Sequence, residues 1–281
     1  MKRFTIILIA MLVCPLSIFS QVISFGTKTV KANDVYVTKQ IKIDNFDCLE
    51  VAGSMDVVYT QSTGKPGLEI YTSENIINLL DIKVANGTLK IKFKKGYNIK
   101  YNKLIIRASS ETLHAINLAG SGSIDLSKGL KSSRLHVELA GSGDIIGKKI
   151  FCQDDLNISI AGSGEVELQQ LACNDLYLNV AGSGDMTLKD VDANITKAEV
   201  AGSGCINLFG KSNEAMFEIA GSGDIMASDL VAKKVKVSIA GSGDVECHAT
   251  DHLKVSISGS GEVGYKGNPQ LDLPKRGIHK L

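Results

Sequence analysis

Ala119-Gly120-Ser121-Gly122 is the first of seven copies of one tetrapeptide in the C-terminal part of the chain. The last copy spans 240–243, and the variant Ser258-Gly259-Ser260-Gly261 closes the series. An imperfect copy, Ala52-Gly53-Ser54-Met55, stands alone upstream. Successive copies from residue 119 onward are 18–21 residues apart. A fixed period of that size is typical of a protein built from stacked, identical units.

The residues around each tetrapeptide keep one parity. In the first copy Ile116 and Leu118 precede the glycines and Ile124 follows them, so every second residue is apolar or glycine. Side chains on a strand alternate between its two faces. Both glycines are therefore expected to face inward at a bend, where a missing Cβ avoids crowding of the core and permits positive φ. These bend glycines are Gly120, Gly122, Gly141, Gly143, Gly162, Gly164, Gly182, Gly184, Gly202, Gly204, Gly221, Gly223, Gly241, Gly243, Gly259 and Gly261.

A cycle of about 20 residues with short strands and corners predicts one coil of a parallel β-helix. A further apolar residue, such as Leu130, often follows about eight residues after the motif and predicts a third, shorter wall. The alternative makes each Gly-Ser-Gly a hairpin turn in an antiparallel sandwich or meander. The constant phase favours the β-helix, because stacked coils require it and a meander needs a second tight turn of similar strength. Eight coils spaced ~4.8 Å apart make a rod of roughly 40 Å.

The first 20 residues predict a signal peptide. Lys2 and Arg3 precede an apolar run over 4–13, and small residues follow over 17–20. The apolar run is too short for a stable membrane span, and no second run of spanning length follows. A lipoprotein would need acylation of Cys14, against which Val13 argues because it is larger than the small residue usual there. We expect an extracytoplasmic protein, in the periplasm, at the outer-membrane surface or secreted, with no transmembrane span.

The N-terminal region differs from the repeats and is expected to cap one end of the rod. Asn86-Gly87 between two alternating segments predicts a hairpin, and residues 73–81 predict one short helix with Ser73 as its N-cap. The expected organisation is a signal peptide (1–20), a flexible leader (21–34), a β-rich cap portion (35–112), the β-helix (113–263) and a C-terminal cap and tail (264–281).

Several features together resemble a known family. Phe46 and Leu49-Glu50-Val51 lead to Gly53-Ser54, and the chain closes on Tyr265-Lys266-Gly267-Asn268-Pro269. Leu79-Leu80 with Ile82, Val84, Gly87, Leu89 and Ile91 forms the middle of the pattern. With the repeated Gly-Ser-Gly, the sequence from Ile43 to about Asp272 resembles the bacterial autotransporter adhesins with a head GIN domain, common in Bacteroidetes. The resemblance implies a secreted, right-handed β-helical protein and transfers no catalytic residues.

The residue after the second glycine is acidic in six of the eight copies. In stacked coils these side chains form an outward ladder with neighbours ~5 Å apart, and adjacent like charges repel. Two explanations stay open. Each carboxylate accepts backbone N–H bonds at its own bend, or the ladder binds cations or a cationic or hydroxyl-rich partner. The acids are Asp144, Glu165, Asp185, Asp224, Asp244 and Glu262.

One segment is strongly basic. From Ile82 to Ser110 there are seven lysines, one arginine and no acid, and the lysines alternate with apolar residues. This alternation is typical of the solvated face of a strand. The functional alternative is a patch, centred on Lys90, Lys92 and Lys94 within residues 83–107, that meets acidic polysaccharide, lipopolysaccharide or another anionic surface.

Catalytic and metal-binding patterns are missing from the sequence. None of the histidines, which are His114, His136, His248, His252 and His279, lies in a His-Glu-x-x-His frame, and eight equivalent serines are not a nucleophile. Five cysteines follow residue 20 without a Cys-x-x-Cys pair, which argues against zinc and a disulfide framework. One disulfide between neighbouring coils stays open in an oxidising compartment. Cys247, His248, Asp251 and His252 fit a polar corner loop better than a metal site.

The function expected from these observations is surface interaction. A formal net charge of +1 gives no general attraction to nucleic acid. We expect a non-enzymatic adhesin or envelope scaffold without cofactor, whose partner is an envelope glycan or a surface protein. The alternatives are a polysaccharide-active β-helix enzyme, and an envelope glycan or lipid binder that uses the basic face of Lys83 to Arg107.

Overall fold

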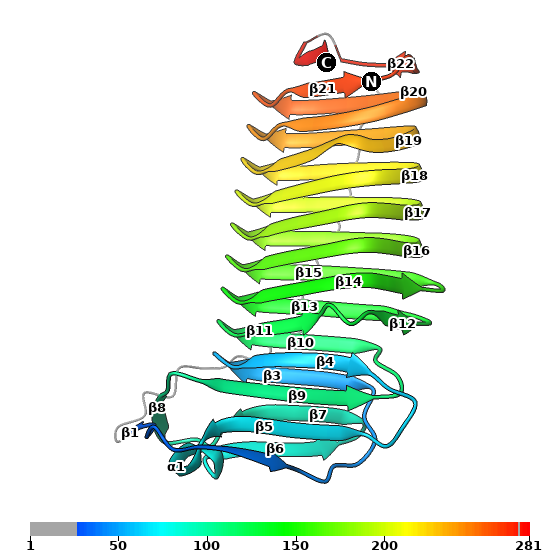
Figure 1. The fold of residues 1–281 in the computed structure, drawn as a ribbon. Helices are drawn as coiled ribbons and strands as arrows, with labels where there is room; N and C mark the ends of the chain where they lie inside the picture. The colour runs from blue at the N-terminus through cyan, green and yellow to red at the C-terminus, as the bar shows by residue number, and fades with distance from the viewer. Residues whose placement is uncertain (1–26, 275) are drawn as a thin grey trace.

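The structure is a computed structural model that describes residues 27–274 and 276–281. It is almost all-β, with 72% strand and 2% helix, and forms a parallel β-solenoid of about eight turns (Figure 1). Neighbouring coils pair in parallel, so the β-helix prediction is confirmed and the antiparallel meander is wrong.

Each motif position lies over the same position of the next coil. Gly141 pairs with Gly120 on one side and with Gly162 on the other. The imperfect upstream copy belongs to the same stack, because Gly53 pairs with Gly120. The imperfect copy starts at residue 52, which is 67 residues before the first complete tetrapeptide at residue 119, because the segment 62–114 is inserted between the two coils.

The coils have three walls, named here in chain order around the glycine bend. The first wall, before the glycines, contains β3 (Cys48–Gly53), β10 (Ala115–Gly120), β13 (Leu135–Gly141) and β15 (Asp155–Gly162). The second wall contains β4 (Asp56–Gln61), β11 (Ser123–Leu126) and the start of β14 (Asp144–Cys152), and the third contains β12 (Leu130–Ser132) and the end of β14. Later strands run through the bends and contribute to all three walls: β16 (Glu165–Gly182), β17 (Asp185–Gly202), β18 (Cys205–Gly221), β19 (Asp224–Gly241) and β20 (Val245–Gly259).

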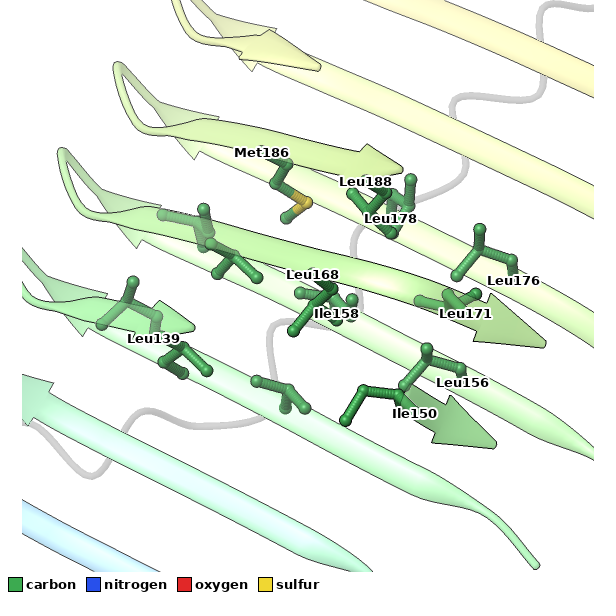
Figure 2. Packing of buried hydrophobic residues seen from close by; sticks show 14 of the residues in the cluster. Leu139, Ile150, Leu156, Ile158, Leu168, Leu171, Leu176, Leu178, Met186 and Leu188 are labelled. Carbon is green, nitrogen blue, oxygen red and sulfur yellow. The ribbon is translucent and has the colours of Figure 1, made fainter. Parts of the chain in front are cut away.

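Inward side chains of the three walls form one continuous core. Figure 2 shows Ile158 and Leu178 of the first wall, Leu168 of the second and Leu171 of the third pointing into the same interior. The apolar residues about eight positions past the motif are all buried, which confirms the third wall; they are Leu130, Ile150, Leu171, Val191 and Leu230.

Both glycines of each bend lie against the backbone of the neighbouring coil, but they differ in conformation and burial. The first is half-buried and has positive φ, for example +128° at Gly182, where an added Cβ would lie 2.5 Å from the carbonyl oxygen of Gly162 in the neighbouring coil. That oxygen accepts the N–H of Ser183 at 2.8 Å. The second, such as Gly184, is buried, and its Cβ would meet Ile160 of the core at 2.6 Å and the carbonyl oxygen of Gly164 at 2.7 Å. Contact between stacked backbones thus requires both glycines, and crowding of the core is a further reason for the second.

A second bend has positive φ without a glycine signature. Lys149, Gln170 and Asp190 have φ of 59°, 54° and 53°, and they lie in register immediately before the third wall. Left-handed backbone is uncommon for such residues. The period and the parity of the sequence did not reveal this column.

The N-terminal cap ends the parallel stack with antiparallel strands, at the foot of Figure 1. Strand β7 (Thr88–Phe93) lies parallel to β3, and β9 (Leu104–Ser110) lies parallel to β4. Beyond them, β6 (Leu80–Ala85) pairs antiparallel with β7, β5 (Gly67–Ser73) with β9, and β2 (Tyr36–Gln40) with β5. The predicted hairpin at Asn86-Gly87 is confirmed, with φ of 52° and 75°.

The predicted helix is shorter than expected. Helix α1 spans only Glu74–Ile77, because Leu80 is already buried in β6. Ser73 precedes the helix but its side chain does not cap it; the hydroxyl donates to the carbonyl of Asn33 at 2.6 Å.

The expected flexible leader (21–34) contains a strand. Residues Lys28–Lys31 form β1, which pairs in parallel with β8 (Tyr97–Lys100) as a separate two-stranded sheet beside the cap (Figure 1). Residues 21–26 and the expected signal peptide lie outside the described residues.

The other end of the rod is covered by three short strands. Strand β21 (Val263–Lys266) and β22 (Gln270–Asp272) pair with β20, and β23 (Ile278–Lys280) pairs with β21. Short terminal strands of this kind leave little free sheet edge.

Replacing a first bend glycine should cost more than backbone strain alone. Gly182→Ala brings a Cβ against the stacked carbonyl as well as an unfavourable φ, so the free energy of unfolding should fall by about 3 kcal/mol or more. Gly129→Ala is the matched control, because φ there is +90° but the nearest atom lies 3.5 Å away; it should cost about 1–2 kcal/mol. Urea denaturation measures both, and equal losses would contradict the role of stacking.

Candidate functional site

The acidic residues after the bends form one column on the outside of the solenoid. Asp144, Glu165 and Asp185 pair in register in successive coils. The column begins earlier than the sequence indicated, because Asp56 of the imperfect copy pairs with Ser123. The broken motif at Met55 hid this member, although its position after the bend could have revealed it.

Several carboxylates of the column bind backbone of the following coil. Asp224 Oδ1 accepts the N–H of Asp244 at 2.9 Å, and Asp244 Oδ1 accepts that of Glu262 at 2.8 Å. Asp185 accepts the N–H of Cys205 at 3.0 Å. The hydrogen bond thus joins neighbouring coils, and the expectation of a bond within each residue's own bend is wrong for these three. The backbone N–H groups bound to these three carboxylates offset part of the repulsion along the column.

No metal centre forms around these acids. Among residues 27–274 and 276–281, no group of three or more His, Cys, Asp or Glu side chains is placed to hold a metal ion. In the corner sequence after residue 246, Cys247 is buried in the core while Asp251 is exposed and accepts the hydroxyl of Thr250 at 2.7 Å.

The basic face is partly neutralised by acids from other strands. Lys90 forms an ion pair with Glu50 of β3, and Lys92 lies 3.8 Å from Asp81 of β6. Lys94 donates to the backbone carbonyl of Asn78 at 2.8 Å. These partners lie outside the segment 82–110, so a count of charges along that segment could not include them.

Lysines without carboxylate partners gather instead on the two-stranded sheet of β1 and β8. We call this sheet, with Lys28, Lys31, Lys95 and Lys100, the basic ribbon. Lys31 pairs with Lys100 across it, and none of the four lysines makes an ion pair with a residue that the structure describes. The ribbon borders a hollow of about 470 Å³ that also includes Tyr101. Burial raises the pKa of the Tyr101 phenol, which donates to the carbonyl of Ser54 at 2.8 Å.

A second hollow, of about 220 Å³, lies on the outer face of the first wall. Its lining comes from four successive coils and includes His136, Asn157, Tyr177 and Lys197, which pair in register. Tyr177 is 37% exposed. Partial desolvation and the nearby carboxylates of Asp175 and Asp155 raise the pKa of its phenol. Parity placed these side chains outward, but only the stack brings them together.

The five cysteines in the described part of the chain are free thiols. Burial raises the pKa of Cys152, Cys173 and Cys247 to about 12. Cys152 and Cys173 follow the paired residues Phe151 and Ala172 and so lie in adjacent coils. Because the thiolate is the reactive form, these groups are inert at neutral pH.

The fold and its outward columns define a β-solenoid with polar walls. The chain belongs to the family described as "Putative auto-transporter adhesin, head GIN domain", whose profile matches residues 45–170 and 156–269. The resemblance inferred from the sequence is thereby confirmed. No curated protein matches the chain.

Crystal structures of Parabacteroides proteins are similar over most of the chain. A "Putative lipid binding protein" from Parabacteroides distasonis is 33% identical, with a TM-score of 0.67 and coverage of 90% of this chain and 100% of that one. A "putative adhesin" from Parabacteroides merdae is 28% identical, with a TM-score of 0.68 and coverage of 90% and 96%. A "putative adhesin" from Parabacteroides distasonis is 25% identical, with a TM-score of 0.65 and coverage of 90% and 100%.

None of the helical segments in the described residues is long and apolar enough to cross a membrane.

The inter-coil hydrogen bond of Asp224 predicts a difference between two substitutions. Asp224→Asn keeps an oxygen that accepts the N–H of Asp244, so the free energy of unfolding should change by less than about 0.5 kcal/mol. Asp224→Ala removes the acceptor and should cost about 1 kcal/mol in urea denaturation. Asp144, whose side chain makes no hydrogen bond to a described residue, is the control. An Asp144→Ala loss as large as that of Asp224→Ala would contradict the structural role.

The buried thiols predict a fall in stability at alkaline pH. Between the ordinary thiol pKa of 9.0 and about 12, the folded chain keeps protons on Cys152, Cys173 and Cys247 that the unfolded chain releases. The free energy of unfolding should therefore decrease as pH rises through this range, by at most about 1.4 kcal/mol per pH unit for each thiol. Urea denaturation at pH 8, 9 and 10.5 should show a shallower dependence for Cys247→Ala. An unchanged slope would contradict the assignment.

Proposed function

We propose that the chain is a non-catalytic surface-interaction protein that acts outside the cytoplasm as an adhesin or envelope scaffold. The observation that carries the proposal is the in-register stacking of outward polar side chains over about eight turns. Flat walls with a spacing of ~4.8 Å between equivalent side chains suit an extended partner, such as an envelope glycan or a strand-rich surface protein.

Three further points support this proposal. The family description names an adhesin. The expected signal peptide directs the chain out of the cytoplasm. Five hollows in the described part of the chain measure about 210–470 Å³. None of them combines a nucleophile with a general base in hydrogen-bond contact, as acid–base and nucleophilic catalysis require.

The polysaccharide-active enzyme has less support. Glycoside hydrolysis commonly needs two carboxyl groups on opposite sides of the scissile bond. The carboxylates that follow the bends instead form one column, in which Asp185, Asp224 and Asp244 accept backbone hydrogen bonds.

A second candidate function is binding of an anionic surface through the basic ribbon. Lys90 and Lys92 of the basic face predicted from the sequence have carboxylate partners. The lysines of the basic ribbon are therefore better candidates for binding an anionic surface. The ribbon also borders the 470 Å³ hollow. A crystal structure 33% identical to this chain is described as a "Putative lipid binding protein", which agrees with this direction.

Cell binding tests the first function. Fluorescently labelled chain lacking residues 1–20 should bind intact Parabacteroides distasonis cells saturably, and excess unlabelled chain should displace it. Labelled maltose-binding protein is the control. Binding no greater than that of the control would overturn the surface-interaction function.

Vesicle binding tests the second function in the same preparation. Vesicles of phosphatidylglycerol and phosphatidylcholine should bind the chain in low salt. The double variant Lys31→Glu/Lys100→Glu should bind them at least about ten-fold more weakly than the wild type. Lys128→Glu/Lys148→Glu, on the shaft of the solenoid, is the matched control. Equal binding by both variants would remove the ribbon as an anion-binding surface.

A further inference from the structure

We propose that the hollow on the outer face of the first wall is a binding site for a neutral glycan. In this site the ring of Tyr177 is a platform for one sugar unit, and Asn157, Ser159 and Asn179 form its hydrogen-bonding floor. The inference rests on the proposed surface-interaction function and names the ligand class for one wall.

The shape of the site follows from the order of side chains in two columns. One column runs His136, Asn157, Tyr177 and Lys197, and the other runs Glu138, Ser159, Asn179 and Glu199. The short side chains of Asn157, Ser159 and Asn179 in the middle coils are surrounded by longer ones, which are Tyr177 and the four residues of the flanking coils. On a flat sheet this order leaves a depression, which accounts for the hollow of about 220 Å³.

The floor offers free hydrogen-bonding groups. Asn157 and Asn179 are half-buried, and their side-chain amides make no hydrogen bond with any residue in 27–274 or 276–281. Each amide has two donors and one acceptor oxygen, and the Ser159 hydroxyl can do either. These groups can both donate and accept hydrogen bonds, as sugar hydroxyl groups can, so the two sets are complementary. Half-buried amides without a protein partner gain more from a ligand than fully solvated ones.

The platform is Tyr177. The residue is 37% exposed, and its hydroxyl lies 3.5 Å from Asp175 Oδ2. Tyrosine presents a large apolar ring with one polar tip, which suits a ligand with an apolar face and a hydroxylated rim. A sugar ring has this form, because its C–H bonds gather on one face and its hydroxyl groups point outward. The scarcity of aromatic residues in the chain as a whole, 5%, does not exclude a single platform.

Carboxylates are the prevailing charges around the hollow. Lys197 forms an ion pair with Glu199, and His136 Nε2 lies 2.8 Å from Glu138 Oε1. The carboxylates of Asp155 and Asp175 also lie close enough to act on the Tyr177 phenol. These negative charges disfavour an acidic polysaccharide, whose complement would be the basic ribbon, and so favour a neutral ligand here.

The size of the site sets the mode of binding. Pockets for drug-sized ligands measure ~300–1,000 Å³, and this hollow is smaller. It accommodates one sugar unit of a longer chain, while the neighbouring units lie across the flat outer face of the wall.

Affinity electrophoresis in native gels tests the site. The probes are four soluble neutral polysaccharides, dextran, mannan, laminarin and arabinogalactan, each cast separately into the gel. At least one should retard the wild-type chain. Tyr177→Ala should raise the dissociation constant about ten-fold, because it removes the apolar ring on which the sugar unit lies. Tyr177→Phe keeps the ring and should retain most of the retardation.

Two further variants separate the site from general effects. Asn157→Ala/Asn179→Ala should weaken retardation while leaving the circular dichroism spectrum and the urea midpoint unchanged, because both amides point outward. Phe151→Ala removes another aromatic side chain, 49% exposed on the third wall, and should bind like the wild type.

The inference is overturned if none of the four polysaccharides retards the wild-type chain, or if Tyr177→Ala and Phe151→Ala behave alike. The two experiments distinguish failure of the glycan site from failure of the proposed surface-interaction function. Saturable cell binding without retardation removes only the glycan site, whereas cell binding at the level of the maltose-binding control removes the surface-interaction function.

Discussion

The structure depends on how closely the coils approach one another at the glycine bend. The carbonyl of each first glycine accepts a backbone N–H from the following coil and lies where a Cβ of that coil would be, as Gly162 does beneath Gly182. Only glycine combines this contact with a positive φ. One inserted side chain would separate two coils along their whole perimeter, because the strands on both sides of the bend share the same register.

Strict register also decides what the outer surface can be. Equivalent side chains of successive coils must lie next to each other, so any residue type favoured at one position becomes a column. For acids this arrangement is costly, and the chain offsets the cost with hydrogen bonds from Asp185, Asp224 and Asp244 to the backbone of the next coil. These hydrogen bonds join neighbouring coils and so stabilise the stack. The neutral residues Ser123 and Cys205 also occupy positions in the column and reduce its charge.

Specific recognition then arises where the repetition is broken. On the first wall, short residues between longer ones produce the hollow beside Tyr177. At the cap, the insertion between the first two coils carries β8, which pairs with β1 and collects lysines without carboxylate partners. A uniform wall offers an extended partner many equal contacts. The two irregular places differ from it and from each other, because the hollow suits a neutral ligand and the basic ribbon suits an anionic one.

The sequence by itself determined the period, the inward parity, the three walls, the hairpin at Asn86-Gly87 and the family. These features repeat or depend on neighbouring residues, so they are visible along the chain. Only the tertiary structure decided which charged side chains lack an ionic partner. Lys90, for example, forms an ion pair with Glu50, which lies 40 residues earlier in the chain. It also decided the short helix, the strand at Lys28–Lys31 and the hollow at Tyr177, since each results from contacts between segments distant in sequence.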